Sequence, residues 1–157
     1  QRHDRHQRHT GLDALTDLLP ILSLDAHFVS LQYKSAAAEI ATFKLNRDHK
    51  VDLVEYPWAT LTDDYDDTAA LVAACDYVLC IQTAVARTAG ALGVPTTVLL
   101  PTTSNWFYGH EGEKVLWHES IRVLRQDTPG EWNREIEISA RFLADKFGLP
   151  RAADQAA

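Results

Sequence analysis

The stretch from Tyr77 to Pro101 constrains the fold of this chain more than any other. It reads YVLCIQTAVARTAGALGVPTTVLLP, in which two apolar runs flank a segment of small residues. The apolar runs predict buried strands over 77–82 and 96–100. The segment between them predicts a helix that closes at Gly93, because glycine commonly follows the last helical turn. Two strands joined by one helix are typical of a parallel sheet.

Helix and strand patterns alternate along the rest of the chain. In chain order, the sequence predicts a helix over 10–24, a strand over 27–32, a helix over 35–48, a strand over 50–56, a helix behind the acidic loop, a strand over 120–126 and a helix over 131–148. Ser35 and Asp67 are the expected N-caps of two of these helices, and Phe147 is an expected buried residue of the last one. This alternation predicts an α/β fold in which helices cover both faces of a mostly parallel sheet.

The predicted domain covers residues 11–149. Residues 1–10 are basic and rich in histidine, and residues 150–157 are polar and small, so both ends are expected to be mobile. A chain of 157 residues is long enough for one domain with its own hydrophobic core.

The composition argues against several classes of function. The formal net charge is −7, whereas nucleic-acid-binding proteins usually carry a basic face. No apolar run approaches the roughly 20 residues that span a bilayer, and the polar N-terminal residues do not resemble a signal peptide. We therefore expect a cytoplasmic protein without a membrane span, in which Cys75 and Cys80 are reduced, buried thiols.

Two groups of residues resemble metal ligands, but neither predicts a metal site. His3, His6 and His9 lie on a loose segment that offers no fixed coordination geometry. The aspartates at 63–67 are better explained by helix capping, because the glycine-bearing spacing of a calcium loop is absent. We expect no metal and no cofactor.

Polar side chains follow nearly every predicted strand. In open α/β sheets, ligands bind beyond the carboxyl ends of the strands. The strand ends carry Gln32, Tyr33, Lys34, Glu55, Tyr56, Gln82, Thr83, Thr102, Thr103 and Gln126. At Gln82-Thr83 the next helix begins, and its free N–H groups suit a phosphate. The small residues of that helix indicate either close approach of a ligand or close packing on the sheet.

The connection after the strand at 96–100 is rich in aromatic residues. Trp106, Phe107, Tyr108 and Trp117 could stack against a sugar or a base, or could anchor a long loop to the core. His110 and His118 could act as acid or base groups, although no neighbouring residue in the sequence fixes such a role.

The motifs FVSLQYK, DDTAALVAACDYVLC and IQTAVARTAGALGVP, followed by RVLRQ, resemble a known family. They are similar to the C-terminal domain of family 9-like glycosyltransferases, which are GT-B enzymes related to lipopolysaccharide heptosyltransferases. The most similar version is that found at the end of bacterial tetratricopeptide-repeat proteins. The resemblance implies a Rossmann-like domain that binds a nucleoside-diphosphate sugar and forms one half of a GT-B enzyme.

The resemblance also implies a set of donor-binding residues, which are Gln32, Lys34, Gln82, Thr83, Ala84 and Arg87. Gln82 stands where the family has an aspartate, and Arg87 stands where it has a histidine. A glutamine can hydrogen-bond sugar hydroxyls but cannot act as a base, whereas an arginine can clamp a phosphate. No catalytic base is identified, and in inverting GT-B enzymes the base commonly comes from the other domain.

Parts of the family's architecture are missing from this sequence. One domain of the two is present, and the resemblance implies that a central strand between 27–32 and 77–82 is absent. The chain also contains no methionine, so we expect it to be processed or part of a longer polypeptide. An upstream segment or another chain is the expected partner that completes the fold, and the acceptor is unknown. The alternative expectation is a non-catalytic, glycosyltransferase-like scaffold or interaction domain.

Overall fold

The computed structural model describes residues 15–45 and 51–150, which divide into two compact units. We call residues 62–131 the four-stranded unit, and the described residues of 15–61 and 132–150 the two-stranded unit. The predicted mobile segment 1–10, including its three histidines, lies outside the described residues. The same holds for the predicted tail beyond Pro150.

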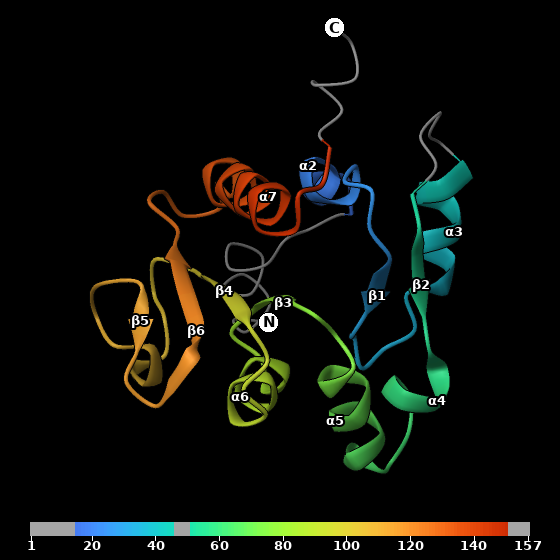
Figure 1. Cartoon of the computed structure of the whole chain (residues 1–157), viewed down its shortest axis with the longest axis horizontal. Coiled ribbons are helices and arrows are strands. Elements are labelled where there is room, and N and C mark those ends of the chain that lie inside the picture. The colour runs from blue at the N-terminus through green and yellow to red at the C-terminus, as the bar shows by residue number, and fades with distance from the viewer. Residues whose placement is uncertain (1–14, 46–50, 151–157) are drawn as a thin grey trace, which may run out of the picture. The chain divides into compact units, whose positions relative to one another are not determined.

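The four-stranded unit contains a mostly parallel sheet with the strand order β3-β4-β6-β5 (Figure 1). Strands β3, β4 and β6 run parallel, and β5 pairs antiparallel with β6. The elements of this unit are α5 (Tyr65–Ala73), β3 (Val78–Ile81), α6 (Ala84–Ala91), β4 (Thr96–Leu100), η2 (Trp106–Tyr108), β5 (Lys114–Val115) and β6 (His118–Arg125). The short strand β5 and the 3-10 helix η2 are not evident from the sequence pattern.

Strand β4 lies at the centre of this sheet, and all five of its residues are buried. Its register aligns Leu99 with Ile81 of β3, and Leu100 with Arg125 of β6. The hydrophobic core of the unit consists of Ala86, Val98, Leu100, Tyr108, Val115, Ile121 and Val123. Because the three parallel strands end at the same edge, the residues that follow them emerge side by side.

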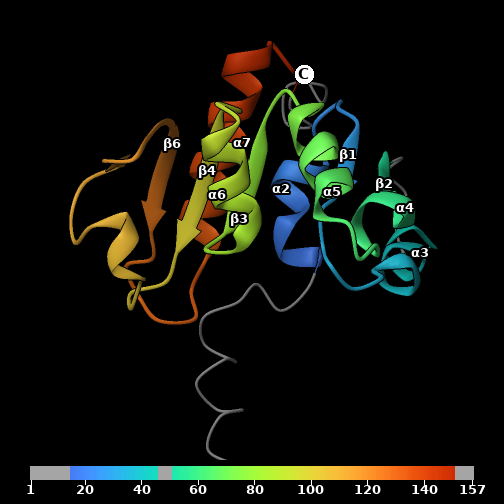
Figure 2. The ribbon, with the colours of Figure 1, turned by 90° about the horizontal axis from the view of Figure 1, so that it is seen from below.

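Helix α6 packs on this sheet through its small residues (Figure 2). Ala86, Ala89 and Gly90 are buried. A Cβ atom on Gly90 would lie 2.6 Å from Cγ of His118 and 2.6 Å from Cδ1 of Ile121, both on β6. Close packing of α6 on the sheet therefore explains why these three positions have small residues.

The ends of the helices only partly follow the predicted caps. Gly93, with φ of 72°, closes α6 as expected, and Val94 N donates to Ala89 O at 2.9 Å. The expectation for Asp67 is wrong: Asp64 is the N-cap of α5, and its Oδ1 accepts from Asp66 N at 3.0 Å. The acidic run offers several capping carboxylates, and the helix begins early enough to place Asp67 in its first turn.

The two-stranded unit contains a parallel pair, β1 and β2, and a helix-rich core. Its elements are η1 (Leu15–Leu18), α2 (Leu19–Leu22), β1 (Phe28–Ser30), α3 (Ala37–Leu45), β2 (Leu53–Glu55), α4 (Pro57–Thr60) and α7 (Asn133–Phe147). Ser35 caps α3 from one position before the N-cap: its Oγ accepts from Ala37 N at 3.3 Å, whereas the carbonyl of Ala36 accepts the first helical bond, from Ile40 N at 2.8 Å. Phe147, in contrast, is 41% exposed in the last turn of α7, where we expected it to be buried.

The α/β class predicted from the sequence is confirmed, but the described residues form two sheets instead of one. Among these residues, β1 pairs with β2 alone and β3 pairs with β4 alone, which leaves one edge of each strand without a described partner. Within residues 15–45 and 51–150, no helix is both long and apolar enough to cross a bilayer.

Cys80 on β3 packs against the core of the four-stranded unit, and its burial raises the pKa of the thiol from 9.0 to about 12. We expect a Cys75→Ser variant to resist Ellman's reagent at pH 8. A thiol with a pKa of about 12 has about a thousandfold less thiolate than one with a pKa of 9.0. The rate at which thionitrobenzoate is released from the reagent measures the reactivity of Cys80.

The guanidinium-unfolded variant is the control for this measurement, and an equal rate in the folded protein would contradict the prediction. Because the folded-state pKa is the higher one, the thiol's stabilising contribution is complete below pH 9 and is lost as the pH rises towards 12.

Candidate functional site

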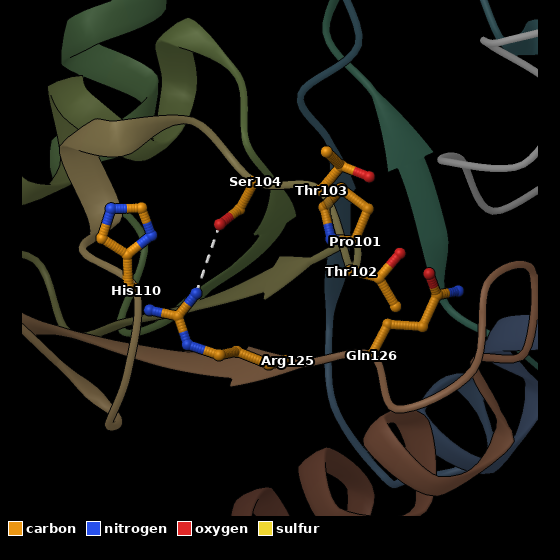
Figure 3. A pocket seen from close by; sticks show the side chains of 7 residues that line it. All are labelled: Pro101, Thr102, Thr103, Ser104, His110, Arg125 and Gln126. Carbon is orange, nitrogen blue, oxygen red and sulfur yellow. Dashed lines mark hydrogen bonds between the residues drawn. The ribbon is translucent and has the colours of Figure 1, made fainter.

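A pocket of about 400 Å³ lies at the carboxyl ends of β4 and β6 (Figure 3). The backbone N–H of Gln126 donates to Leu100 O at 2.8 Å, which continues the pairing of the two strands by one residue. The pocket is lined by Pro101, Thr102, Thr103, Ser104, His110, Arg125 and Gln126. The structure thus brings together three of the polar residues expected at strand ends, namely Thr102, Thr103 and Gln126.

Gln126 is a buried polar residue without a hydrogen-bonding partner for its side chain. It is 4% exposed, and neither Nε2 nor Oε1 has a partner among the described residues. In Figure 3 its amide extends from the end of β6 on the same side as Thr102. Burying an unpaired amide costs about 1–3 kcal/mol, so pairing of this side chain with a group beyond the described residues would be stabilising.

Arg125 holds the loop that follows β4. Its Nη2 donates to the carbonyl oxygens of Tyr108 at 2.8 Å and Gly109 at 3.2 Å, and its Nε donates to that of Gly112 at 3.3 Å. Its Nη1 donates to Ser104 Oγ at 3.2 Å (Figure 3). All four acceptors are uncharged, and Arg125 forms no ion pair within the described part of the chain.

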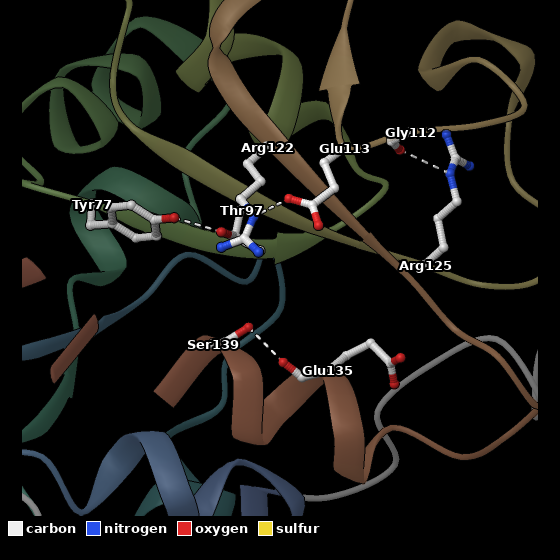
Figure 4. Close-up of polar contacts among 8 residues, drawn as sticks. All are labelled: Tyr77, Thr97, Gly112, Glu113, Arg122, Arg125, Glu135 and Ser139. Atoms are coloured by element: carbon white, nitrogen blue, oxygen red, sulfur yellow. Dashed lines mark hydrogen bonds and ion pairs between the residues drawn. The ribbon is translucent and has the colours of Figure 1, made fainter. Parts of the chain in front are cut away.

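Arg122, three residues earlier on β6, differs from Arg125 because it forms an ion pair. Its Nε donates to a carboxylate oxygen of Glu113 at 2.9 Å (Figure 4). The positive charge of Arg122 is therefore paired, whereas that of Arg125 faces only neutral groups.

Gln82 and Arg87, two of the donor-binding residues expected from the sequence, contact the same loop. Oε1 of Gln82 accepts from the backbone N–H of Asn105 at 3.0 Å. Oδ1 of Asn105 in turn accepts from Phe107 N at 3.0 Å, which begins η2. The guanidinium of Arg87 lies 5.4 Å from the centre of the Phe107 ring. Both side chains thus anchor the loop from outside it.

Thr83 and Ala84 lie at the start of α6. Thr83 is the N-cap residue, but its hydroxyl does not bond to the first N–H groups of the helix and instead donates to Ile81 O at 3.4 Å. Both residues are exposed. The start of α6 is consequently open to solvent, as an anion site requires, although this feature alone does not define one.

Gln32 and Lys34 belong to the two-stranded unit and follow β1. Both are exposed, and Lys34 Nζ lies 5.6 Å from the centre of the Tyr33 ring. Nearby, the carboxylate of Glu55 accepts from Ser35 Oγ at 2.9 Å and from Ala36 N at 2.8 Å. The other four predicted donor-binding residues, Gln82, Thr83, Ala84 and Arg87, belong to the four-stranded unit.

The aromatic residues of the connection mainly anchor it to the core. Tyr108 is buried, and Phe107 stacks on Trp117 with ring centres 6.4 Å apart. His118 lies against Phe107 at 5.9 Å, whereas His110 lines the pocket. Trp106 is 74% exposed and remains available for stacking.

Sequence patterns do not single out Arg125 or Ser104 as residues of the pocket. Arg125 falls inside the predicted strand 120–126, where a charged residue is normally expected to point to solvent. A signal is nevertheless present, because Arg125 and Gln126 are consecutive polar residues directly after the apolar pair Val123 and Leu124.

Comparison with known proteins gives one informative relative. The chain is 33% identical over 118 residues to protein FlbA of Caulobacter vibrioides. The match covers 75% of this chain but 19% of FlbA, so the chain spans about a fifth of the length of that relative. No protein-family model matches the chain. No solved structure matches it significantly.

Proposed function

We propose that this chain is the donor-binding half of a GT-B glycosyltransferase, which binds a nucleoside-diphosphate sugar and transfers the sugar together with a second domain. The observation that carries the proposal is the polar pocket at the carboxyl ends of β4 and β6, beside the open start of α6. This is the edge at which α/β proteins bind nucleotides. The similarity of residues 32–126 to family 9-like glycosyltransferases supports the same function.

Each part of this edge has a role in the proposed complex. The first N–H groups of α6 and the Arg87 guanidinium face the diphosphate, which needs hydrogen-bond donors and positive charge. The resemblance alone adds Gln32 and Lys34, which belong to the two-stranded unit, to the proposed donor-binding residues. Neither a metal nor a cofactor is required, because these groups can offset the charge of the leaving diphosphate.

The remainder of the enzyme is supplied from outside this chain in our proposal. The edges of β1 and β3 that lack a partner among the described residues could each accept a strand from an upstream segment or a partner chain. The same partner contributes the catalytic base and the acceptor site. We place the assembled protein in the cytoplasm, where nucleotide sugars are available.

A thermal-shift panel tests donor binding directly. We expect at least one of UDP, GDP, ADP and dTDP, or a sugar conjugate of these, to raise the melting temperature of the 157-residue chain. Arg87→Gln removes the guanidinium but keeps a polar side chain, and we expect it to weaken nucleotide binding by about tenfold or more. The dissociation constants are measured by calorimetry.

Arg141→Gln is the matched control, because Arg141 is an exposed arginine on α7 in the two-stranded unit. It should bind the nucleotide as tightly as the unmodified chain. Equal affinities of the two variants would remove Arg87 from the site, and the absence of any nucleotide response would refute donor binding.

A second function, that of a non-catalytic scaffold, is favoured by one specific observation. Gln82 and Arg87 are both engaged in holding the loop at Asn105 and Phe107. Side chains at these positions can therefore be explained without a ligand. A stable complex with a partner chain, combined with no affinity for any nucleotide sugar, would favour the scaffold.

A further inference from the structure

We propose that the pocket at the ends of β4 and β6 binds the glycosyl unit of the donor and selects a sugar acid over a neutral sugar, through Arg125 and Gln126. This inference rests on the proposed function, in which the diphosphate lies at the neighbouring start of α6. The volume of about 400 Å³ is near the lower end of the ~300–1,000 Å³ range of small-molecule sites. It suits one monosaccharide unit, with the nucleotide outside.

The charge of the pocket favours an anionic group. The chain as a whole carries a net charge of −7, yet the pocket lining contains a guanidinium and an imidazole and no carboxylate. The hydrogen bonds of Arg125 to carbonyl and hydroxyl oxygens fix its orientation without neutralising it. A guanidinium has five N–H groups, and four are used here, which leaves one on Nη1 beside Ser104.

An anionic group alone cannot pair with both polar atoms of the Gln126 amide. Its Nε2 is a donor and its Oε1 is an acceptor, and neither has a partner among residues 15–45 and 51–150. A carboxylate or phosphate group can accept from Nε2 and from Arg125 but cannot donate to Oε1. The ligand must therefore also bring a donor, and a sugar hydroxyl is one.

The rest of the lining fits the same ligand. Thr102, Thr103 and Ser104 place three hydroxyl groups around the pocket, as the close view shows (Figure 3). A hydroxyl can donate or accept, so these residues can pair with several hydroxyls of one sugar ring. A neutral sugar could pair with Gln126 and the hydroxyl groups but would give Arg125 no anionic partner. A sugar acid could do both, because its carboxylate would pair with Arg125.

The probes for this inference are glucuronate and glucose, used free and as their UDP conjugates. The two sugars differ only in a carboxylate that replaces a hydroxymethyl group. We expect the 157-residue chain to bind UDP-glucuronate about tenfold or more tightly than UDP-glucose in calorimetry. This preference should decrease with added salt, because it depends on charge.

Two substitutions at Gln126 sharpen the test. Gln126→Leu should reduce the affinity for UDP-glucuronate while leaving the affinity for UDP unchanged. Gln126→Glu adds a carboxylate at the same place, and we expect it to abolish or reverse the preference for the acid. Gln126→Leu should also keep or raise the melting temperature, since it removes an unpaired buried amide. A lower melting temperature would mean that the amide is paired within the protein, and would overturn the inference.

The outcomes separate this inference from the proposed function. If UDP binds but the two conjugates bind equally, the inference fails and nucleotide binding stands. If no UDP compound binds, free glucuronate and glucose are compared by NMR. Saturable shifts at Ser104 and Gln126 with glucuronate alone would support the pocket on its own evidence, and their absence would overturn it.

Discussion

Replacing Gly90 by valine should lower the free energy of unfolding by about 2 kcal/mol or more, because the new side chain has no space between α6 and β6. Even a single Cβ atom would lie 2.6 Å from Cγ of His118 and from Cδ1 of Ile121. The end of the isoleucine can rotate, but the ring carbon of the histidine can move only with the whole side chain. Denaturant unfolding measured by far-UV circular dichroism gives the change.

The matched control for Gly90 is Ala91→Val. Ala91 is the next residue of the same helix and is exposed, so the same side chain is added without a clash. Its expected cost is about 0.5 kcal/mol, which reflects the lower helix propensity of valine. Similar losses at the two positions would contradict the close approach of α6 and β6.

Arg125→Met should loosen the loop between β4 and β5 and destabilise the four-stranded unit by about 2–4 kcal/mol. Methionine keeps most of the aliphatic stem but leaves the carbonyl oxygens of Tyr108, Gly109 and Gly112 without this donor. We expect faster amide exchange over residues 104–112, measured by hydrogen–deuterium exchange with mass spectrometry. Denaturant unfolding measures the loss of stability.

Arg122→Met is the control for this prediction. Arg122 lies on the same strand, and its ion pair with Glu113 joins side chains that are 31% and 63% exposed. Exposed pairs contribute about 0–1 kcal/mol, so this variant should lose little stability and should leave exchange over 104–112 nearly unchanged. Equal effects of the two variants would show that the hydrogen bonds of Arg125 do not hold the loop.

The elements with continuous apolar or small-residue patterns could be predicted from the sequence. The strand over 96–100 was expected at those bounds, since a fully buried central strand produces an uninterrupted apolar run. The helix closed by Gly93 was also expected, because a positive φ favours glycine. In contrast, β5 has only two residues, which are too few to produce a pattern.

The candidate site was predictable only where its residues follow strands. Thr102, Thr103 and Gln126 are found by the rule that ligands bind beyond the carboxyl ends of strands, and they do line one pocket. The role of Arg125 depends on the path of a loop that returns over the strand end, which no local pattern encodes. The engagement of Gln82 with Asn105 is likewise a contact between residues 23 positions apart.

The close packing at Gly90 also bears on which elements near the pocket can change their position, the helix α6 or the loop after β4. Helix α6 lies so close to β6 that even a Cβ atom on Gly90 would clash with His118 and Ile121, so we expect little freedom for the helix to move towards the sheet. The loop over residues 102–112, in contrast, is held by hydrogen bonds from side chains that can exchange partners. Diversification among related chains should therefore proceed by changes in this loop, with the helix and the strand ends kept as an invariant frame.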